Sequence, residues 1–144
     1  MLASRHIVLG VSGGVAAYKA VHLARELTKA GAEVRVIMTD SASAFVGEAS
    51  FAAVTGSHPT VGLFGDEDVS PHTTLARWAD AIVVAPLTAS TLSRLASGQS
   101  SDALVATILA AQVPVVLAPA MHTEMWEHPA TRRTLGRDRH NRVS

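Results

Sequence analysis

Two short segments of the chain combine residue types that bind anions or flat rings. The first, Gly10–Gly14 (GVSGG), holds three glycines that let backbone N–H groups approach a phosphate at the start of the following helix, where the helix dipole favours negative charge. The second, Ala118–Trp126 (APAMHTEMW), combines large apolar side chains with His122, which can donate, accept or carry charge near neutral pH. Together they predict an anion-binding turn and a partly apolar wall that carries one polar group.

The first turn has three possible interpretations. Besides an anion site, its Gly-x-Ser-x-Gly pattern matches a nucleophile elbow, with Ser12 as an acyl-transfer nucleophile. It also suits a tight turn that binds nothing. It is neither the dinucleotide Gly-x-Gly-x-x-Gly pattern nor a Walker loop. An elbow needs strands before it in a larger sheet, whereas this turn follows the first strand. We therefore favour a ligand-binding turn, because other polar turns are expected at the same sheet edge.

The elements around this turn predict a right-handed βαβ unit. His6–Val11 is an apolar, β-branched strand, and Val15–Ala30 shows a helical period that Gly31 caps. Glu33–Met38 is the second strand, parallel to the first. In an open parallel α/β sheet, ligands bind beyond the carboxyl ends of the strands, where both segments above are expected.

The rest of the chain continues the α/β pattern. We expect short helices at Gly47–Val54, from His72 and at Thr88–Ala96, a loop over 57–71, and a helix at Ala103–Ala111 capped by Asp102. The third strand, Ala81–Ala85, should stop at Pro86, and Val113–Ala118 should form a buried fourth strand. The arginine-rich segment beyond Pro129 should be a solvated helix with a frayed tail, and His128 should order the turn before it.

Composition excludes several classes of function. The chain has 144 residues, 48% of them hydrophobic, and 12 basic residues balance 12 acidic ones, so net charge gives no case for nucleic acid or an anionic membrane. It has no cysteine, and the spacing of its histidines fits no standard zinc pattern, so we expect no metal site. Its apolar runs are shorter than the about 20 residues that a membrane-spanning helix needs. We expect a cytoplasmic protein.

Four motifs in the same order and spacing resemble a known family. They are Gly10–Lys19 (GVSGGVAAYK), His72–Asp80 (HTTLARWAD), Ala85–Thr91 (APLTAST) and Pro119–Trp126 (PAMHTEMW). They resemble the flavin-dependent cysteine decarboxylases, most closely the phosphopantothenoylcysteine decarboxylase domain of the bifunctional coenzyme A biosynthesis protein. The resemblance implies a three-layer Rossmann-like, flavodoxin-like parallel sheet with bound FMN.

The resemblance also assigns site residues. The flavin-binding positions would be Ser12, Gly13, Gly14, Val15, Thr39, Ser41, Thr88, Ala89, Ser90, Thr91, Ala120 and Met121. Of these, Thr88–Thr91 would hold the phosphate at a helix start and Met121 would line the isoalloxazine, which suits hydroxyl groups and a polarizable thioether. His72 matches the catalytic base. His122 stands where the family usually has Asn, in the position that grips the substrate carboxylate, and Ser90 also replaces a common Asn.

The implied reaction converts 4′-phospho-N-pantothenoylcysteine to 4′-phosphopantetheine. The cysteine would be oxidised to a thioaldehyde, which favours loss of CO2, and the product would be reduced again by the same flavin, with no net redox change. Two alternatives remain open: a flavin-binding trimeric module without full decarboxylase activity, and a peptide-cysteine decarboxylase.

The resemblance implies an assembly as well. The flavin would lie at contacts between subunits of a homotrimer or of a trimer-based dodecamer. Family enzymes continue into a substrate clamp that bears a cysteine, and this chain has none. We therefore expect residues 1–144 to form one flavoprotein domain that is truncated at its C-terminus relative to the family.

Overall fold

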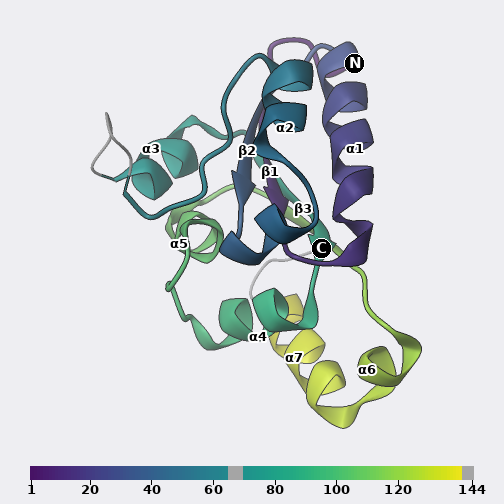
Figure 1. The fold of residues 1–144 in the computed structure, drawn as a ribbon. Helices are drawn as coiled ribbons and strands as arrows, with labels where there is room; N and C mark the ends of the chain where they lie inside the picture. The colour runs from purple at the N-terminus through teal and green to yellow at the C-terminus, as the bar shows by residue number, and fades with distance from the viewer. Residues whose placement is uncertain (65–69, 141–144) are drawn as a thin grey trace.

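The computed structural model describes residues 1–64 and 70–140, with side chains up to residue 136. Its centre is a parallel four-stranded sheet in the order β2-β1-β3-β4 (Figure 1). The strands are β1 (His6–Val11), β2 (Glu33–Met38), β3 (Ala81–Leu87) and β4 (Val115–Pro119). The two strands of the predicted βαβ unit therefore have the predicted bounds.

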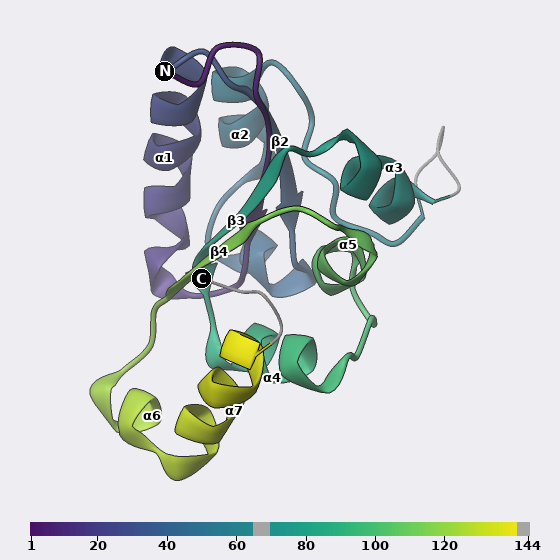
Figure 2. The ribbon, with the colours of Figure 1, turned by 180° about the vertical axis from the view of Figure 1, so that it is seen from behind.

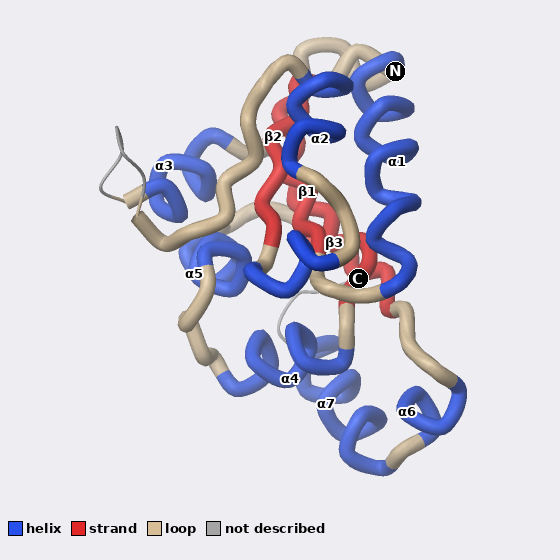
Figure 3. The backbone as a smooth tube through the Cα atoms, viewed as in Figure 1, coloured by secondary structure: helices blue, strands red, loops and turns tan. Residues whose placement is uncertain are grey.

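Helices cover both faces of the sheet and make three layers (Figure 3). The helices α1 (Tyr18–Lys29) and α2 (Glu48–Thr55) cover one face. The helices α3 (Pro71–Trp78), α4 (Ala89–Ser97) and α5 (Ala103–Ala110) pack against the other. Successive strand residues enter opposite cores, because side chains alternate across a strand: Val8 packs on the α5 side and Leu9 on the α1 side. The three-layer, flavodoxin-like α/β fold is confirmed.

The last two helices extend from the lower end of the sheet (Figure 2). They are the short α6 (Thr123–Glu127) and α7 (Pro129–His140), and α7 packs against α4. His128 orders the turn between them as expected, because its Nδ1 accepts a hydrogen bond from the Ala130 N–H at 3.1 Å. The predicted frayed tail falls largely on residues 141–144, outside the described residues.

Strand order places a topological switch point between β1 and β3. The chain leaves β1 for β2 on one side of it and later returns to β3 on the other side. The loops after β1 and β3 therefore diverge to opposite faces of the sheet and leave a crevice beyond their carboxyl ends, which is where open α/β sheets bind ligands. The fold thus puts the Gly10–Gly14 turn at the position best suited to a ligand.

Two strand predictions were wrong in part. Pro86 does not end β3, which continues to Leu87: a proline can be accommodated where a strand is irregular, and the β3–β4 register shifts between Val84 and Leu87. The fourth strand is not buried throughout, since Val116 is 47% exposed. This strand pairs only with β3 in the described sheet, so it lies at the sheet edge. Its exposure alternates along the strand, because only one of its faces is covered.

The predicted loop after α2 contains one piece of regular pairing. Thr60 forms an isolated parallel bridge with Ile37, and its N–H and C=O bond the backbone of Val36 and Met38 at 2.8 Å each. This pairing lies at the outer edge of β2. Residues 65–69 of the same loop lie outside the described residues.

Candidate flavin site at the sheet edge

Ser12 joins the carboxyl ends of the two central strands. Its Oγ donates to the Pro86 carbonyl at 2.5 Å and accepts from the Thr88 N–H at 2.9 Å, and its own N–H donates to the same carbonyl. The residue is completely buried. Its hydroxyl is therefore a structural link between the β1 and β3 loops and is inaccessible to a substrate, so the acyl-transfer interpretation of Ser12 is wrong.

Gly13 lets the β1 turn lie against the loop after β2. A Cβ at this position would lie 2.6 Å from the backbone carbonyl carbon of Ser41, a separation that real Cβ atoms essentially never show. Ser41 belongs to the short 3₁₀ helix η2 (Asp40–Ala44), and its Oγ lies 3.3 Å from the Oγ1 of buried Thr39. The glycine is required here for close approach of two backbones.

The start of α4 supplies polar groups on one side of the crevice. Thr88 is the N-cap residue, and its Oγ1 accepts from the Thr91 N–H at 3.3 Å. Arg94 lies one turn further along and donates to the Ser90 and Thr91 hydroxyls at 2.9 and 3.1 Å. Its Nη2 also lies 2.8 Å from Asp102 Oδ2. Hydroxyl groups, free N–H groups of a first helical turn and a guanidinium suit an anion.

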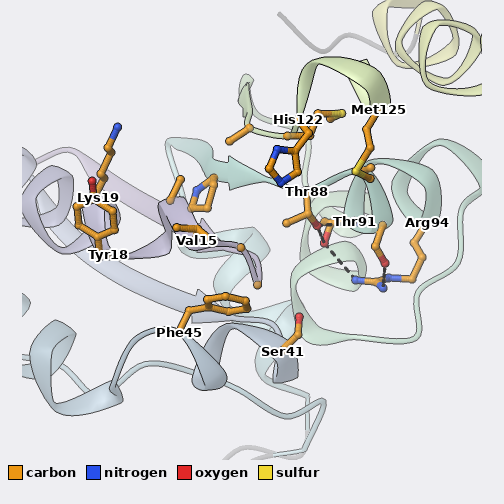
Figure 4. A pocket seen from close by; sticks show the side chains of 18 residues that line it. Val15, Tyr18, Lys19, Ser41, Phe45, Thr88, Thr91, Arg94, His122 and Met125 are labelled. Atoms are coloured by element: carbon orange, nitrogen blue, oxygen red, sulfur yellow. Dashed lines mark hydrogen bonds between the residues drawn. The ribbon is translucent and has the colours of Figure 1, made fainter. Parts of the chain in front are cut away.

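The rest of the crevice lining is more apolar and more exposed. Figure 4 shows His122 and Met125 across the space from Ser41 and Phe45. Phe45 and Met125 are 49% and 47% exposed, unusually high values for large apolar residues. His122 occupies the N-cap position of α6 but its side chain makes no cap hydrogen bond, and its imidazole is exposed. Together, Phe45, Met125 and His122 offer flat apolar contacts and one polar ring.

These groups enclose one cavity of about 640 Å³. The volume lies in the roughly 300–1,000 Å³ range of small-molecule sites. The cavity is lined by Gly13, Gly14, Val15, Ala16, Tyr18, Lys19, Ser41, Phe45, Pro86, Thr88, Ala89, Ser90, Thr91, Arg94, Ala120, Met121, His122 and Met125. Anion donors at the α4 end and apolar surfaces at Val15, Phe45 and the methionines fit a flat aromatic molecule that carries a phosphate.

Ten of the twelve predicted cofactor positions line this cavity, and so does His122. The two exceptions are Ser12 and Thr39, which are buried behind the lining. Their hydroxyls bond neighbouring protein groups instead, with Ser12 linking two strands and Thr39 contacting Ser41. These two residues therefore support the cavity wall, and their contact with a flavin stays a prediction.

His72 does not line the described cavity. It lies in the first turn of α3, which packs on α5, with its Nε2 3.4 Å from the Ser70 Oγ. Its Nδ1 is buried and has no hydrogen-bond partner within residues 1–64 and 70–140. The structure therefore brings His122, but not His72, to the cavity of the same chain.

Seven lining residues were absent from the predicted catalytic and cofactor positions: Ala16, Tyr18, Lys19, Phe45, Pro86, Arg94 and Met125. Arg94 was detectable, because residues three and four positions apart share a helix face and Arg94 follows Thr91 and Ser90 at these distances. Phe45 carried a weaker signal, an aromatic residue in a polar segment after a strand. Tyr18 and Lys19 lie in the first recognised motif, where nothing in their types pointed to a ligand.

The described residues form neither a metal-ligand cluster nor a membrane-spanning helix. In residues 1–64 and 70–140, no three His, Cys, Asp or Glu side chains gather as metal ligands would. Over the same part of the chain, no helix combines the length and the apolar character required to cross a bilayer.

A phosphate-suited helix start and an apolar wall at the switch point of a parallel sheet define a class of nucleotide-cofactor-binding α/β proteins. Residues 1–142 match the family model described as Flavoprotein, and the chain belongs to this family.

Within this family, the chain is similar in sequence to two curated proteins of the same name. The chain is 52% identical over 127 residues to the coenzyme A biosynthesis bifunctional protein CoaBC of Mycobacterium tuberculosis, which covers 88% of this chain and 30% of that protein. For CoaBC of Bacillus subtilis the identity is 44% over 137 residues, covering 94% and 34%. The chain thus spans about a third of the length of these curated relatives.

Solved structures agree with the fold. The FMN-dependent cysteine decarboxylase SpaF superposes with a TM-score of 0.92 at 35% identity, covering 99% of this chain and 85% of that one. A mutant PPC decarboxylase in complex with pantothenoylaminoethenethiol gives 0.85 at 32% identity, covering 98% and 80%.

Proposed function

We propose that residues 1–144 act as an FMN-dependent decarboxylase domain that converts 4′-phospho-N-pantothenoylcysteine to 4′-phosphopantetheine in coenzyme A biosynthesis. The observation that carries the proposal is a cavity in which the hydroxyl-rich start of α4 and an apolar wall with an accessible imidazole come together. The likeness to CoaBC and to PPC decarboxylase supports this choice of substrate. A cytoplasmic location follows from the same pathway.

The residues of the cavity divide into a cofactor part and a substrate part. Thr88, Ser90 and Thr91 would hold the phosphate of FMN, and Met121 with Val15 would contact its ring. Bound FMN supplies the capacity to accept and return the electrons of the cysteine side chain. His122, in its protonated form, would bind the substrate carboxylate by a charge-assisted hydrogen bond.

His72 is proposed as the catalytic base, supplied by a neighbouring copy of the chain. The cavity lacks His72 of its own chain, so the proposed site is complete only when a second copy approaches its rim. The rim offers an apolar surface for that contact: Val15 is 78% and Tyr18 61% exposed. A homotrimer, alone or in a trimer-based dodecamer, provides such a contact three times by symmetry.

The direct test is to purify the protein, add FMN and measure flavin absorbance, followed by mass spectrometric detection of phosphopantetheine formed from phosphopantothenoylcysteine. We expect a yellow protein that forms the product. A protein that stays colourless with excess FMN contradicts the whole proposal.

Mixing two inactive variants tests the shared site. The mixture contains His72→Asn subunits, inactive alone, and His122→Ala subunits, inactive alone at substrate concentrations far below their raised KM. After co-assembly we expect about a quarter of the sites to be complete, because in a randomly mixed cyclic trimer a subunit with intact His122 is followed by one with intact His72 at one contact in four. No recovery in verified mixed trimers contradicts a site shared in this way. Analytical ultracentrifugation of the wild-type protein checks the trimer itself.

Two alternatives have specific support. The absence of His72 from the described cavity favours a flavin-binding trimeric module without full turnover. The likeness to SpaF favours a peptide-cysteine decarboxylase. Retained flavin without CO2 release from phosphopantothenoylcysteine indicates the first. Faster turnover of a peptide with a C-terminal cysteine indicates the second.

A further inference from the structure

Arg94 makes an unusual set of contacts for a residue beside a cavity. One Nη donates to Ser90 Oγ at 2.9 Å, and the other donates to Thr91 Oγ1 at 3.1 Å and lies 2.8 Å from Asp102 Oδ2. Its side chain is only 28% exposed, and its Nε is buried without a hydrogen-bond partner among the described residues. The guanidinium is thus held from three sides next to the cavity (Figure 4).

Asp102 fixes the guanidinium from a second helix. Its Oδ1 accepts from the Val105 N–H at 2.8 Å and caps α5, so the carboxylate cannot rotate away without breaking the cap. The remaining oxygen faces Arg94, and the carboxylate side chain is only 15% exposed. The pair therefore ties α4 to α5 and sets the position of the guanidinium.

These contacts determine which way the neighbouring hydroxyls point. Because Arg94 has only donors, Ser90 Oγ and Thr91 Oγ1 must accept from it. Thr91 Oγ1 also accepts from Thr88 Oγ1 at 3.3 Å. Thr91 Oγ1 thus accepts twice and Ser90 Oγ once, and neither O–H group donates to a partner among the described residues, so both remain available as donors. A hydroxyl kept as a donor gains more from an anion with several charged acceptor oxygens than from a neutral alcohol, which offers a single uncharged oxygen.

We propose that Arg94 is a specificity-determining positioning residue: held by Asp102, it keeps the Ser90 and Thr91 hydroxyls as donors for a phosphate monoester and thereby selects FMN over riboflavin. This inference rests on the proposed function. The preference for FMN over riboflavin is thereby assigned to Arg94, which acts on the phosphate through the Ser90 and Thr91 hydroxyls. Without these oriented hydroxyls, the start of α4 would offer the phosphate only backbone N–H groups.

The test compares dissociation constants for FMN and riboflavin, measured by flavin fluorescence on titration of the apoprotein. We expect Arg94→Met to weaken FMN about tenfold, the effect of losing charge-assisted orientation at a partly exposed site, with riboflavin unchanged. Arg94→Lys should retain part of the selectivity, because an ammonium reaches one hydroxyl but lacks the fork. Arg25→Met, which removes an exposed charge from α1, is the matched control and should change neither constant.

Ser90→Ala provides a second test that does not depend on the folding of Arg94→Met, because Ser90 is exposed. It should weaken FMN and leave riboflavin unchanged, and its effect should largely disappear in the Arg94→Met background. Equal weakening of both flavins, or no change in FMN affinity in either variant, overturns the inference while the proposed function stands. If the wild-type protein binds neither flavin, the proposed function and this inference fail together.

Discussion

The two sides of the cavity are built in different ways. On the α4 side, side chains bond one another and the strands: Ser12 joins two loops, Thr88 caps the helix and Arg94 links it to Asp102. On the α6 side, no residue of the helix is buried, and its N-cap residue His122 makes no side-chain cap hydrogen bond. One described backbone tie, from the Ala120 N–H to the Leu87 carbonyl at 3.0 Å, holds the start of this segment to β3.

This difference matches two kinds of ligand. A group that stays bound gains affinity from a wall whose donors are fixed in advance, because no ordering is needed on binding. A substrate that must enter and leave needs a wall of lower local stability, with few buried contacts. The comparison therefore supports a cofactor at α4 and a substrate at α6. Substitutions on the α4 side should therefore affect both folding stability and flavin binding. Substitutions on the α6 side should affect only substrate binding.

The largest effect is expected for Gly13→Ala, compared with Gly14→Ala. The new Cβ at Gly13 would meet the Ser41 backbone, which cannot yield as a flexible side chain does, so unfolding free energy should fall by about 3 kcal/mol, the upper range for overpacking. At Gly14 the Cβ meets Thr88 Cγ2 at 3.4 Å in extended backbone, and the change should stay within about 1 kcal/mol. Urea unfolding of both variants measures the difference. Equal losses would show that close approach of the two turns is unimportant.

A smaller effect is expected for Ser12→Ala. The substitution leaves the partly buried Thr88 N–H without its acceptor and the Pro86 carbonyl without one donor, which should destabilise the protein by about 2 kcal/mol. Flavin affinity should fall as well, because the start of α4 is positioned through this hydroxyl. Ser43→Ala, at an exposed serine of η2, is the matched control and should stay within about 0.5 kcal/mol. Loss of activity with unchanged stability would instead point to a direct chemical role for Ser12.

The sequence predicted those parts of the molecule that depend on local order. The bounds of β1 and β2 and the Asp102 cap follow from residue types in one short segment each. The exposure of Val116 was not predictable from its apolar neighbours, because it depends on which strand lies at the sheet edge.

The same distinction applies to the site. The family resemblance named twelve cofactor positions and ten of them line one cavity, because parallel strands bring their carboxyl ends to one edge. The role of Ser12 was not predictable, because its partners lie far along the chain, as in the bond from Thr88 to Ser12. Short motifs identify which residues lie near the cavity, but tertiary contacts decide which of their side chains line it.

The smallest effect is expected on the α6 side, for His122→Asn. His122 is exposed and its side chain makes no cap hydrogen bond, so unfolding free energy should change by less than about 0.5 kcal/mol and the dissociation constant for FMN should not change. An amide still donates to a carboxylate, so the KM for phosphopantothenoylcysteine should stay close to that of the wild type, whereas His122→Leu should raise it with FMN binding intact. His22→Asn, on the exposed face of α1, serves as the control. Loss of flavin from His122→Asn would move this residue to the cofactor part and remove the distinction between the two walls, because both would then hold the same ligand.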